Sequence, residues 1–197
     1  MKNYGDSNWK DKVTAIGGKA ITYDAIGNPL TYDGWTFTWK AGRMLASMVK
    51  TGTNAQFTYD HNGLRIKKVV NGVTTNYTLN GKNVVHMTQG SNDLHFFYDA
   101  QGKPGMVTYN DVDYFYVYNL QGDVVVLIDA NGTQMVEYIY DAWGYLISKT
   151  GTMAATLGTV NPFRYRGYVY DEETELYYLR SRYYNPVWKR FINADSL

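Results

Sequence analysis

The chain has 197 residues, of which 45% are hydrophobic, and a formal net charge of +1. It is long enough to bury a sizeable core, and its hydrophobic content and low net charge exclude intrinsic disorder. The charge balance gives no basic footprint for a nucleic acid, and the absence of cysteine excludes disulfides and thiolate chemistry. With 20 tyrosines, 19 glycines, and 14 aspartates against 4 glutamates, strand and turn formers dominate, which excludes a helical bundle.

A short motif recurs along the chain and organises it. An aromatic residue is followed by Asp, two variable residues and Gly, and degenerate copies at Trp39, Tyr118 and Ile128 help to bring the spacing to about 20 residues. The full motifs and one copy without the glycine comprise Tyr23, Asp24 and Gly27; Tyr59, Asp60 and Gly63; Tyr98, Asp99 and Gly102; Tyr140, Asp141 and Gly144; and Tyr170 and Asp171.

Each motif predicts the tip of a β-hairpin. Asp at the first position of a type I turn accepts hydrogen bonds from the backbone ahead of it, and Gly takes the left-handed conformation that returns the chain to a strand. A hairpin repeated at constant period cannot bury its apolar face alone, so successive hairpins must pair side by side. The sequence therefore predicts an all-β protein, in which the hairpin array forms a curved sheet or a partial β-shell.

The segments between the motifs predict further elements in chain order. Asn71-Gly72 between two apolar pairs predicts a type I′ hairpin turn, and residues 124–128 and 135–140 predict another hairpin. The small, polar segment 149–159 predicts a surface loop. We expect hairpin repeats over residues 1–160 and a distinct, aromatic-rich segment over residues 161–197 that folds back on the same array.

The repeats and the final segment resemble the Rhs and YD-repeat family, which includes bacterial polymorphic toxins, the C components of insect-killing toxin complexes and the teneurin shells of animals. The most specific part is an ordered string that is similar to the repeat-associated core of the family, and it runs through Asn161-Pro162-Phe163-Arg164-Tyr165-Arg166-Gly167-Tyr168, Leu176 to Pro186 and Arg190 to Asp195. The repeats look most like those of wall-associated Gram-positive members. The resemblance implies a hollow β-shell in a secreted or cell-surface protein, plugged by the core, with a C-terminal toxin domain as partner and an immunity protein as an indirect one.

The resemblance also implies an aspartyl-type self-cleavage downstream of the core, with Arg190 and Asp195 at the matching positions. This sequence departs from many relatives at Asn185, where they have Asp, and at Ser196, where they have Pro. We therefore expect a structural role without catalytic turnover for this chain, and keep self-cleavage in a longer parent protein as an alternative.

An adhesion module is the main alternative, because sugar rings stack on exposed aromatic side chains and a Tyr-rich face could bind a glycan or a protein. Against it, aromatic residues at repeat positions predict ladders between neighbouring hairpins. Near the C-terminus, Arg180 and Arg182 are expected to stack on Tyr178 and Tyr184 along one strand face.

The remaining features predict little chemistry. His61, His86 and His95 show no metal-ligand spacing, so the sequence predicts neither a metal site nor a cofactor. No apolar run reaches the ~20 residues of a membrane helix, so we expect no membrane insertion. A short array leaves two unpaired edge strands, and these predict self-association.

Overall fold

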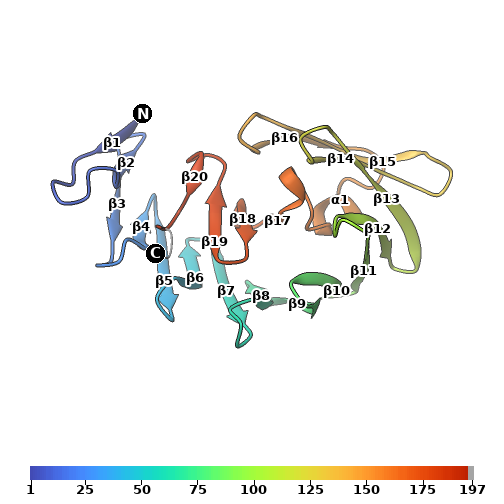
Figure 1. Ribbon diagram of the computed structural model, residues 1–197, viewed down its shortest axis with the longest axis horizontal. Helices are drawn as coiled ribbons and strands as arrows, with labels where there is room; N and C mark the ends of the chain where they lie inside the picture. The colour runs from blue at the N-terminus through green and yellow to red at the C-terminus, as the bar shows by residue number, and fades with distance from the viewer. Residues whose placement is uncertain (195–197) are drawn as a thin grey trace.

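One antiparallel sheet of 16 strands dominates the computed structural model, which describes residues 1–194 (Figure 1). The strands lie in the sheet in chain order, and the sheet bends into an open arc with β1 and β16 at its two edges. This confirms the predicted all-β hairpin array and its curved form. The strands are β1 (Lys2–Tyr4), β2 (Val13–Ile16), β3 (Lys19–Tyr23), β4 (Pro29–Tyr32), β5 (Trp35–Lys40), β6 (Met44–Lys50), β7 (Thr53–Tyr59), β8 (Arg65–Val70), β9 (Val73–Asn80), β10 (Asn83–Gln89), β11 (Asn92–Tyr98), β12 (Pro104–Tyr109), β13 (Val112–Tyr118), β14 (Val124–Ile128), β15 (Gln134–Tyr140) and β16 (Leu146–Thr150).

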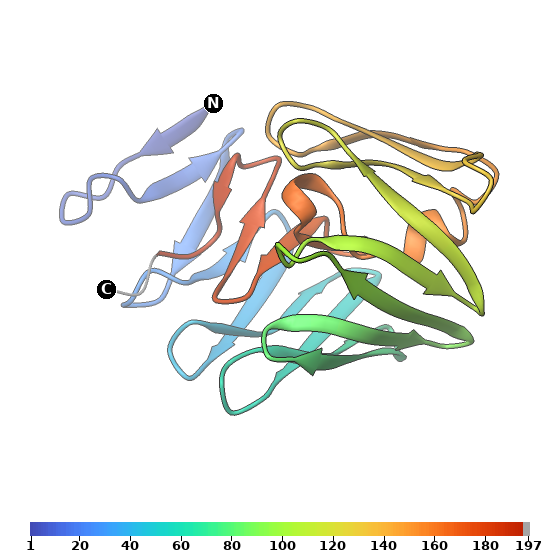
Figure 2. The same cartoon turned by 45° about the vertical axis from the view of Figure 1, so that its right-hand side comes forward.

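The chain then returns along the inside of the arc, as Figure 2 shows from a second direction. We call residues 157–194 the inner segment. It contains a short helix, a 3-10 turn and a four-stranded antiparallel sheet, and so folds back on the array as expected. Its elements are α1 (Leu157–Val160), η1 (Tyr165–Gly167), β17 (Val169–Asp171), β18 (Leu176–Leu179), β19 (Arg182–Asn185) and β20 (Arg190–Phe191).

Asp60 illustrates the turn geometry of the repeats. Its Oδ1 accepts the backbone N–H groups of Asn62 and Leu64 at 2.9 and 2.8 Å, and Gly63 has a φ of 76°. The side chain thereby satisfies donors that the turn leaves without a backbone partner. The same pair of bonds is accepted by side-chain oxygens of Asp24, Asp99, Asn119, Asp129 and Asp141.

One residue bulges from the returning strand after each repeat turn. Tyr98 pairs with Pro104 while Phe97 pairs with Met106, so Gly105 is skipped in the register. A bulge bends its strand and increases the local twist. Bulges repeated at the same end of alternate strands, next to the repeat turns, therefore account for the curvature of the sheet. The other residues skipped next to these turns are Leu30, Ala46, Ile66, Val85, Val125 and Ile147.

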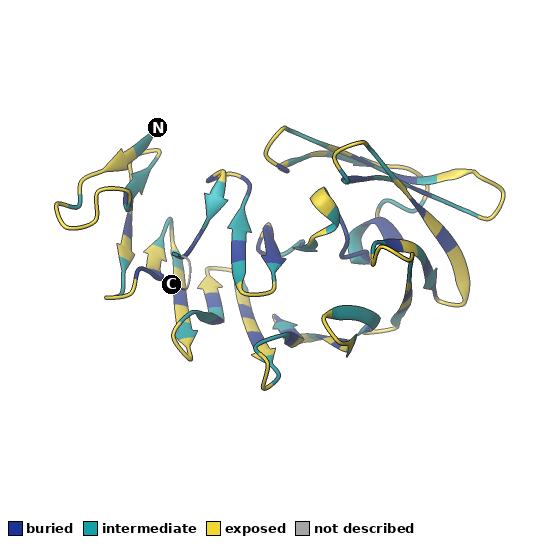
Figure 3. Cartoon of the chain, viewed as in Figure 1, coloured by how far each residue is buried: buried dark blue, intermediate teal, exposed yellow. Residues whose placement is uncertain are grey.

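Two hydrophobic clusters of buried residues lie on the inside of the arc, and Figure 3 colours the buried positions along the strands. The first joins β2 to β8 to the four-stranded sheet of the inner segment, which we call the inner sheet, and includes Leu176 of β18 and Trp188 of the turn between β19 and β20. The second joins β9 to β15 to the start of the inner segment, through Leu157 and Phe163. Burial alternates along the strands, which is why the repeats show a period of two in apolar residues.

The segment 149–159 differs from the predicted surface loop. Its first two residues end β16, and Leu157 and Gly158 at its end are buried. The Tyr138 hydroxyl donates to the Gly158 carbonyl at 2.9 Å, and a Cβ on Gly158 would lie only 3.0 Å from Val136. Composition alone did not predict this burial, because the small residues at the end of the segment permit close packing on β15. Among the described residues, no helix is long and apolar enough to span a bilayer.

Candidate functional site: the junction between the inner segment and the repeat sheet

The aromatic residues of the repeat motifs tie each repeat to the one before it. The Tyr98 hydroxyl donates to the Val84 carbonyl at 2.6 Å. Val84 lies in β10, the strand that follows the preceding repeat turn. The motif residue is thus a hydrogen-bond donor between repeats as well as a packing residue. Equivalent bonds run from Tyr23, Trp39, Tyr59, Tyr118 and Tyr140 to the carbonyls of Val13, Pro29, Leu45, Pro104 and Val124.

Asp171, in the last copy of the motif, has another role. The turn there is closed by the backbone, with the Glu175 N–H donating to the Asp171 carbonyl at 2.8 Å. The carboxylate instead reaches the repeat sheet, where Arg65 Nη1 and Nη2 donate to its two oxygens at 2.5 and 2.9 Å. Lys68 Nζ lies 3.2 Å from the same carboxylate, and the three side chains are 1%, 6% and 0% exposed for Arg65, Lys68 and Asp171.

The charges in this cluster stabilise one another against the cost of burial. Burial alone would raise the pKa of Asp171, but the charges of Arg65 and Lys68 outweigh it and hold that pKa below its ordinary value. Burial alone would lower the pKa of Lys68, and the Asp171 charge outweighs it and raises that pKa. All three groups are therefore ionised at neutral pH, and each depends on the others.

Aromatic rings from both sheets surround the Arg65 guanidinium. Its central carbon lies 4.5 to 5.9 Å from four ring centroids. The Tyr178 hydroxyl also accepts the Arg65 backbone N–H at 2.9 Å. Two of the rings belong to the repeat sheet and two to the inner sheet, so Arg65 links the sheets through cation–π contacts as well as charge. The four rings are those of Phe57, Tyr77, Tyr178 and Tyr183.

A second buried arginine, Arg164, anchors the other end of the inner segment. Its Nη2 donates to the Gly158 carbonyl at 2.6 Å and its Nε to the Asn161 carbonyl at 3.1 Å. The guanidinium carbon lies 4.2 Å from the centroid of the Tyr138 ring in β15, and Nη2 lies 3.1 Å from Glu172 Oε2. Burial alone would lower the pKa of Arg164, and Tyr138 and Glu172 outweigh it and raise that pKa.

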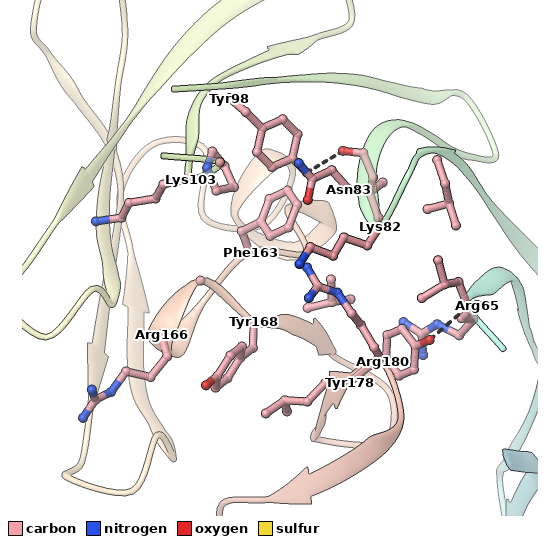
Figure 4. Close-up of a pocket in the computed structure, with 18 of the residues that line it drawn as sticks. Arg65, Lys82, Asn83, Tyr98, Lys103, Phe163, Arg166, Tyr168, Tyr178 and Arg180 are labelled. Atoms are coloured by element: carbon pink, nitrogen blue, oxygen red, sulfur yellow. Dashed lines mark hydrogen bonds between the residues drawn. The ribbon is translucent and has the colours of Figure 1, made fainter. Parts of the chain in front are cut away.

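A cavity of about 620 Å³ opens between the two anchors (Figure 4). Lys82 and Arg180 extend into it, and Tyr98 and Phe163 form part of its apolar wall. Its lining residues carry five cations and no Asp or Glu; Arg65 pairs with Asp171, and Arg166 Nε lies 3.7 Å from Asp123. Such a lining suits an acidic group. The five cations are Arg65, Lys82, Lys103, Arg166 and Arg180.

The residues predicted for self-cleavage are only partly visible. Arg190 lies in β20 and pairs in register with Asn185 of β19. Asp195 lies outside the described residues, so their mutual geometry is not defined. Ala194 is placed by Arg43, whose Nη1 donates to the Ala194 carbonyl at 3.2 Å.

The prediction that the arginines and tyrosines near the C-terminus share one strand face is wrong. A hairpin separates the residues, with Tyr178 in β18, Tyr184 in β19 and Arg180 in the turn at a φ of 63°. Arg182 instead lies over the Phe191 ring, 3.8 Å from its centroid. The sequence looked like one extended strand because it is aromatic and lacks the glycine that usually takes a left-handed turn position.

Sequence reasoning missed Arg65, although the repeats contain a signal for it. Arg65 stands two residues after the turn glycine, where other repeats place apolar residues. A charge at a position that the pattern assigns to the core predicts a buried partner. The partner itself, Asp171, lies 106 residues away in sequence and cannot be read from the repeat. The apolar equivalents of Arg65 are Pro29, Pro104, Val124 and Leu146.

Comparison with known proteins decides the family. The family profile described as teneurin YD-shell matches residues 6–197. The chain belongs to this family. It is thus a segment of a YD shell, which confirms the resemblance stated from the sequence.

Two curated relatives are 38% identical over 195 residues: tRNA nuclease WapA of Bacillus subtilis (strain 168) and tRNA3(Ser)-specific nuclease WapA of Bacillus spizizenii. Each alignment covers 95% of this chain but only 8% of the relative. Among solved structures, the Photorhabdus luminescens Tc holotoxin pore aligns with a TM-score of 0.69 over 88% of this chain and 9% of that chain. At 18% sequence identity, this likeness shows the fold alone.

Proposed function

We propose that this chain is the closing part of a YD shell that encloses or presents a C-terminal toxin domain in a secreted or surface protein. The observation that carries the proposal is the inner segment itself, which crosses the hollow of the arc and is fixed there by the Arg65–Asp171 ion pair. In this interpretation residues 1–160 are wall, and residues 161–197 are the core that plugs it. One relative is named as a tRNA nuclease and one similar structure as a holotoxin, and both names support a link to a toxin.

The placement of the tyrosines favours a shell over an adhesion module. Eight tyrosines belong to the buried core, and three are among the exposed large hydrophobic residues. The Tyr-rich face is therefore mostly the inner face of the arc. The hypotheses of glycan binding and of self-cleavage in the parent protein stay predictions.

The open edges of the arc suggest how the wall continues. In the described part of the chain, β1 pairs only with β2 and β16 only with β15. We expect further repeats of a longer parent protein to pair at these edges, and the chain alone to self-associate through them. Sedimentation of the chain as a monomer at high concentration would contradict self-association.

The test uses a parent protein that carries this chain followed by its downstream region. Limited proteolysis should leave the downstream region intact for much longer than the same region expressed alone. Asp171→Asn should make that region cleavable, because it uncouples the plug from the wall. Asp99→Asn is the control, since Asn119 makes the same turn bonds in another repeat. Equal cleavage of the enclosed and the isolated downstream region would contradict the proposal.

A further inference from the structure

Two histidines and an aspartate meet on the outer face of the β10–β11 hairpin. His86 and His95 are opposite each other in the register, and Asp93 lies on the same face two residues before His95. His86 Nε2 is 3.1 Å from Asp93 Oδ2, and His95 Nε2 is 3.0 Å from Asp93 Oδ1. The two imidazole rings lie in parallel, with centroids 4.2 Å apart.

The repeat bulge brings His86 to this face. Val84 packs against the second hydrophobic cluster, and Met87 is buried in it. In a regular strand, residues 84 and 86 share one face, so His86 would point inward. The bulge at Val85 shifts the alternation by one residue, and His86 thereby points outward beside His95.

The histidine-to-carboxylate distances are those of neighbouring ligand atoms on one metal ion. Two donor atoms that bind one ion at about 2.1 Å lie about 3.0 Å apart at a right angle and about 3.4 Å apart at the tetrahedral angle. The two histidine-to-carboxylate distances fall at this spacing and end on the two oxygens of Asp93, so the carboxylate stands between the rings. One ligand atom from each of the three residues lies within 4.8 Å of the other two. The side chains are 30% to 53% exposed, so an ion can enter from solvent and keep water at its open positions.

We propose that His86, Asp93 and His95 form a binding site for a divalent transition-metal ion, with Zn²⁺ as the expected ion. Two neutral imidazoles and one carboxylate suit Zn²⁺, Ni²⁺ or Cu²⁺, whereas Ca²⁺ and Mg²⁺ prefer all-oxygen sites. The bound ion clamps β10 to β11 on the outside of the shell wall. The site is separate from the inner segment and its anchors, so it is independent of the proposed shell function.

The Asp93 backbone is itself held in place. Its N–H donates to the side-chain oxygen of Asn110 at 2.9 Å, in the turn that follows β12. Thr108 of β12 is opposite His95 in the register, and its hydroxyl donates to the Asp113 carboxylate at 2.6 Å. The ligands therefore stand on paired strands, which keeps them near the geometry that an ion requires.

Isothermal titration of Zn²⁺ into the whole chain, without a histidine tag, tests the site. We expect one ion per chain, and a loss of affinity of about tenfold or more in each of His86→Gln, His95→Gln and Asp93→Asn. His61→Gln is the matched control and should bind as the wild type does, because His61 lies in a separate repeat turn. Far-ultraviolet circular dichroism shows whether each variant is folded.

A spectroscopic arm identifies the ligands. Co²⁺ should give visible d–d bands in the wild type and in His61→Gln, and these bands should be lost in His95→Gln. Two results would overturn the proposal: no saturable Zn²⁺ binding up to about 1 mM, the limit of a weak site, or equal binding by wild type and the His86→Gln/His95→Gln double variant. Either result would mean that Asp93 serves only as a hydrogen-bond partner for the two rings.

Discussion

The two halves of the arc hold the inner segment by different means. On β8, Arg65 and Lys68 bind the carboxylate of Asp171, and all three side chains are buried. In the half that ends at β16, Arg164 of the inner segment lies over the Tyr138 ring of β15, while its hydrogen bonds go to carbonyl groups within the inner segment, and its acidic neighbour Glu172 is 34% exposed. A buried arginine lies at each of the two contacts, but only the contact with the first half depends on a buried carboxylate.

This difference predicts which half fails first. A buried cation without its partner costs several kcal/mol, because the loss of attraction leaves the desolvation penalty in place. Carbonyl groups do not titrate, so the bonds of Arg164 persist as the pH changes. The first half is therefore the sensitive one, both to mutation and to acid.

Asp171→Asn should produce the largest effect. It keeps the shape of the side chain but leaves Arg65 buried without a counter-charge and leaves Lys68 with only the partly exposed Glu173 as a partner, so we expect a loss of about 3–5 kcal/mol in the free energy of unfolding. Urea denaturation measures it. The control Asp99→Asn should change stability by about 0.5 kcal/mol or less. A loss in Asp171→Asn as small as that of the control would mean that the cluster does not stabilise the first half.

Acid should remove the same contribution in the wild type. The folded pKa of Asp171 is lowered, so its stabilisation is fully present above the unfolded value, near 3.8, and is lost as the pH falls through the folded pKa. The stability difference between wild type and Asp171→Asn should therefore be constant at neutral pH and shrink below pH 3.8. Denaturant curves across this range measure it. A difference independent of pH would show that charge is not the cause.

Gly144→Ala tests the attachment of the inner segment to the other half. Gly144 has a φ of +84°, and a Cβ there would lie 2.5 Å from Tyr165 of the inner segment. Gly102 has a similar φ of +76°, but nothing lies within 4 Å of its Cβ position. We expect about 1 kcal/mol of destabilisation for Gly102→Ala and about 2–4 kcal/mol for Gly144→Ala, measured by thermal unfolding. Equal effects would show that Tyr165 does not pack on this turn in solution.

Tyr98→Phe should have the smallest effect, because it removes one hydrogen bond between repeats. The Val84 carbonyl loses its side-chain donor, and we expect about 1 kcal/mol of destabilisation. Tyr168→Phe is the control, since that residue is 39% exposed. Hydrogen exchange around β10 should increase in Tyr98→Phe alone. No change there would contradict a role in joining the repeats.

Much of the repeat sheet was readable from sequence because its determinants are local. Asp60 bonds to residues two and four positions ahead, so the turn appears in any alignment of the repeats. The type I′ turn at Asn71-Gly72 is present for the same reason, with φ values of 50° and 85°. The buried α1 was missed, because the packing of Leu157 and Gly158 on β15 depends on contacts that no local pattern contains.

The sequence alone determined the all-β class, the hairpin tips and the family, since each follows from residues close together in the chain. Only the tertiary structure decided which motif residue leaves the pattern. Asp171 looks like the other motif aspartates, yet its carboxylate pairs with Arg65 from 106 residues earlier. The same holds for His86, which reaches His95 because a bulge reverses the face of β10. Local turns are fixed by short-range hydrogen bonds, whereas the choice of buried partners requires the curvature that sums over all the repeats.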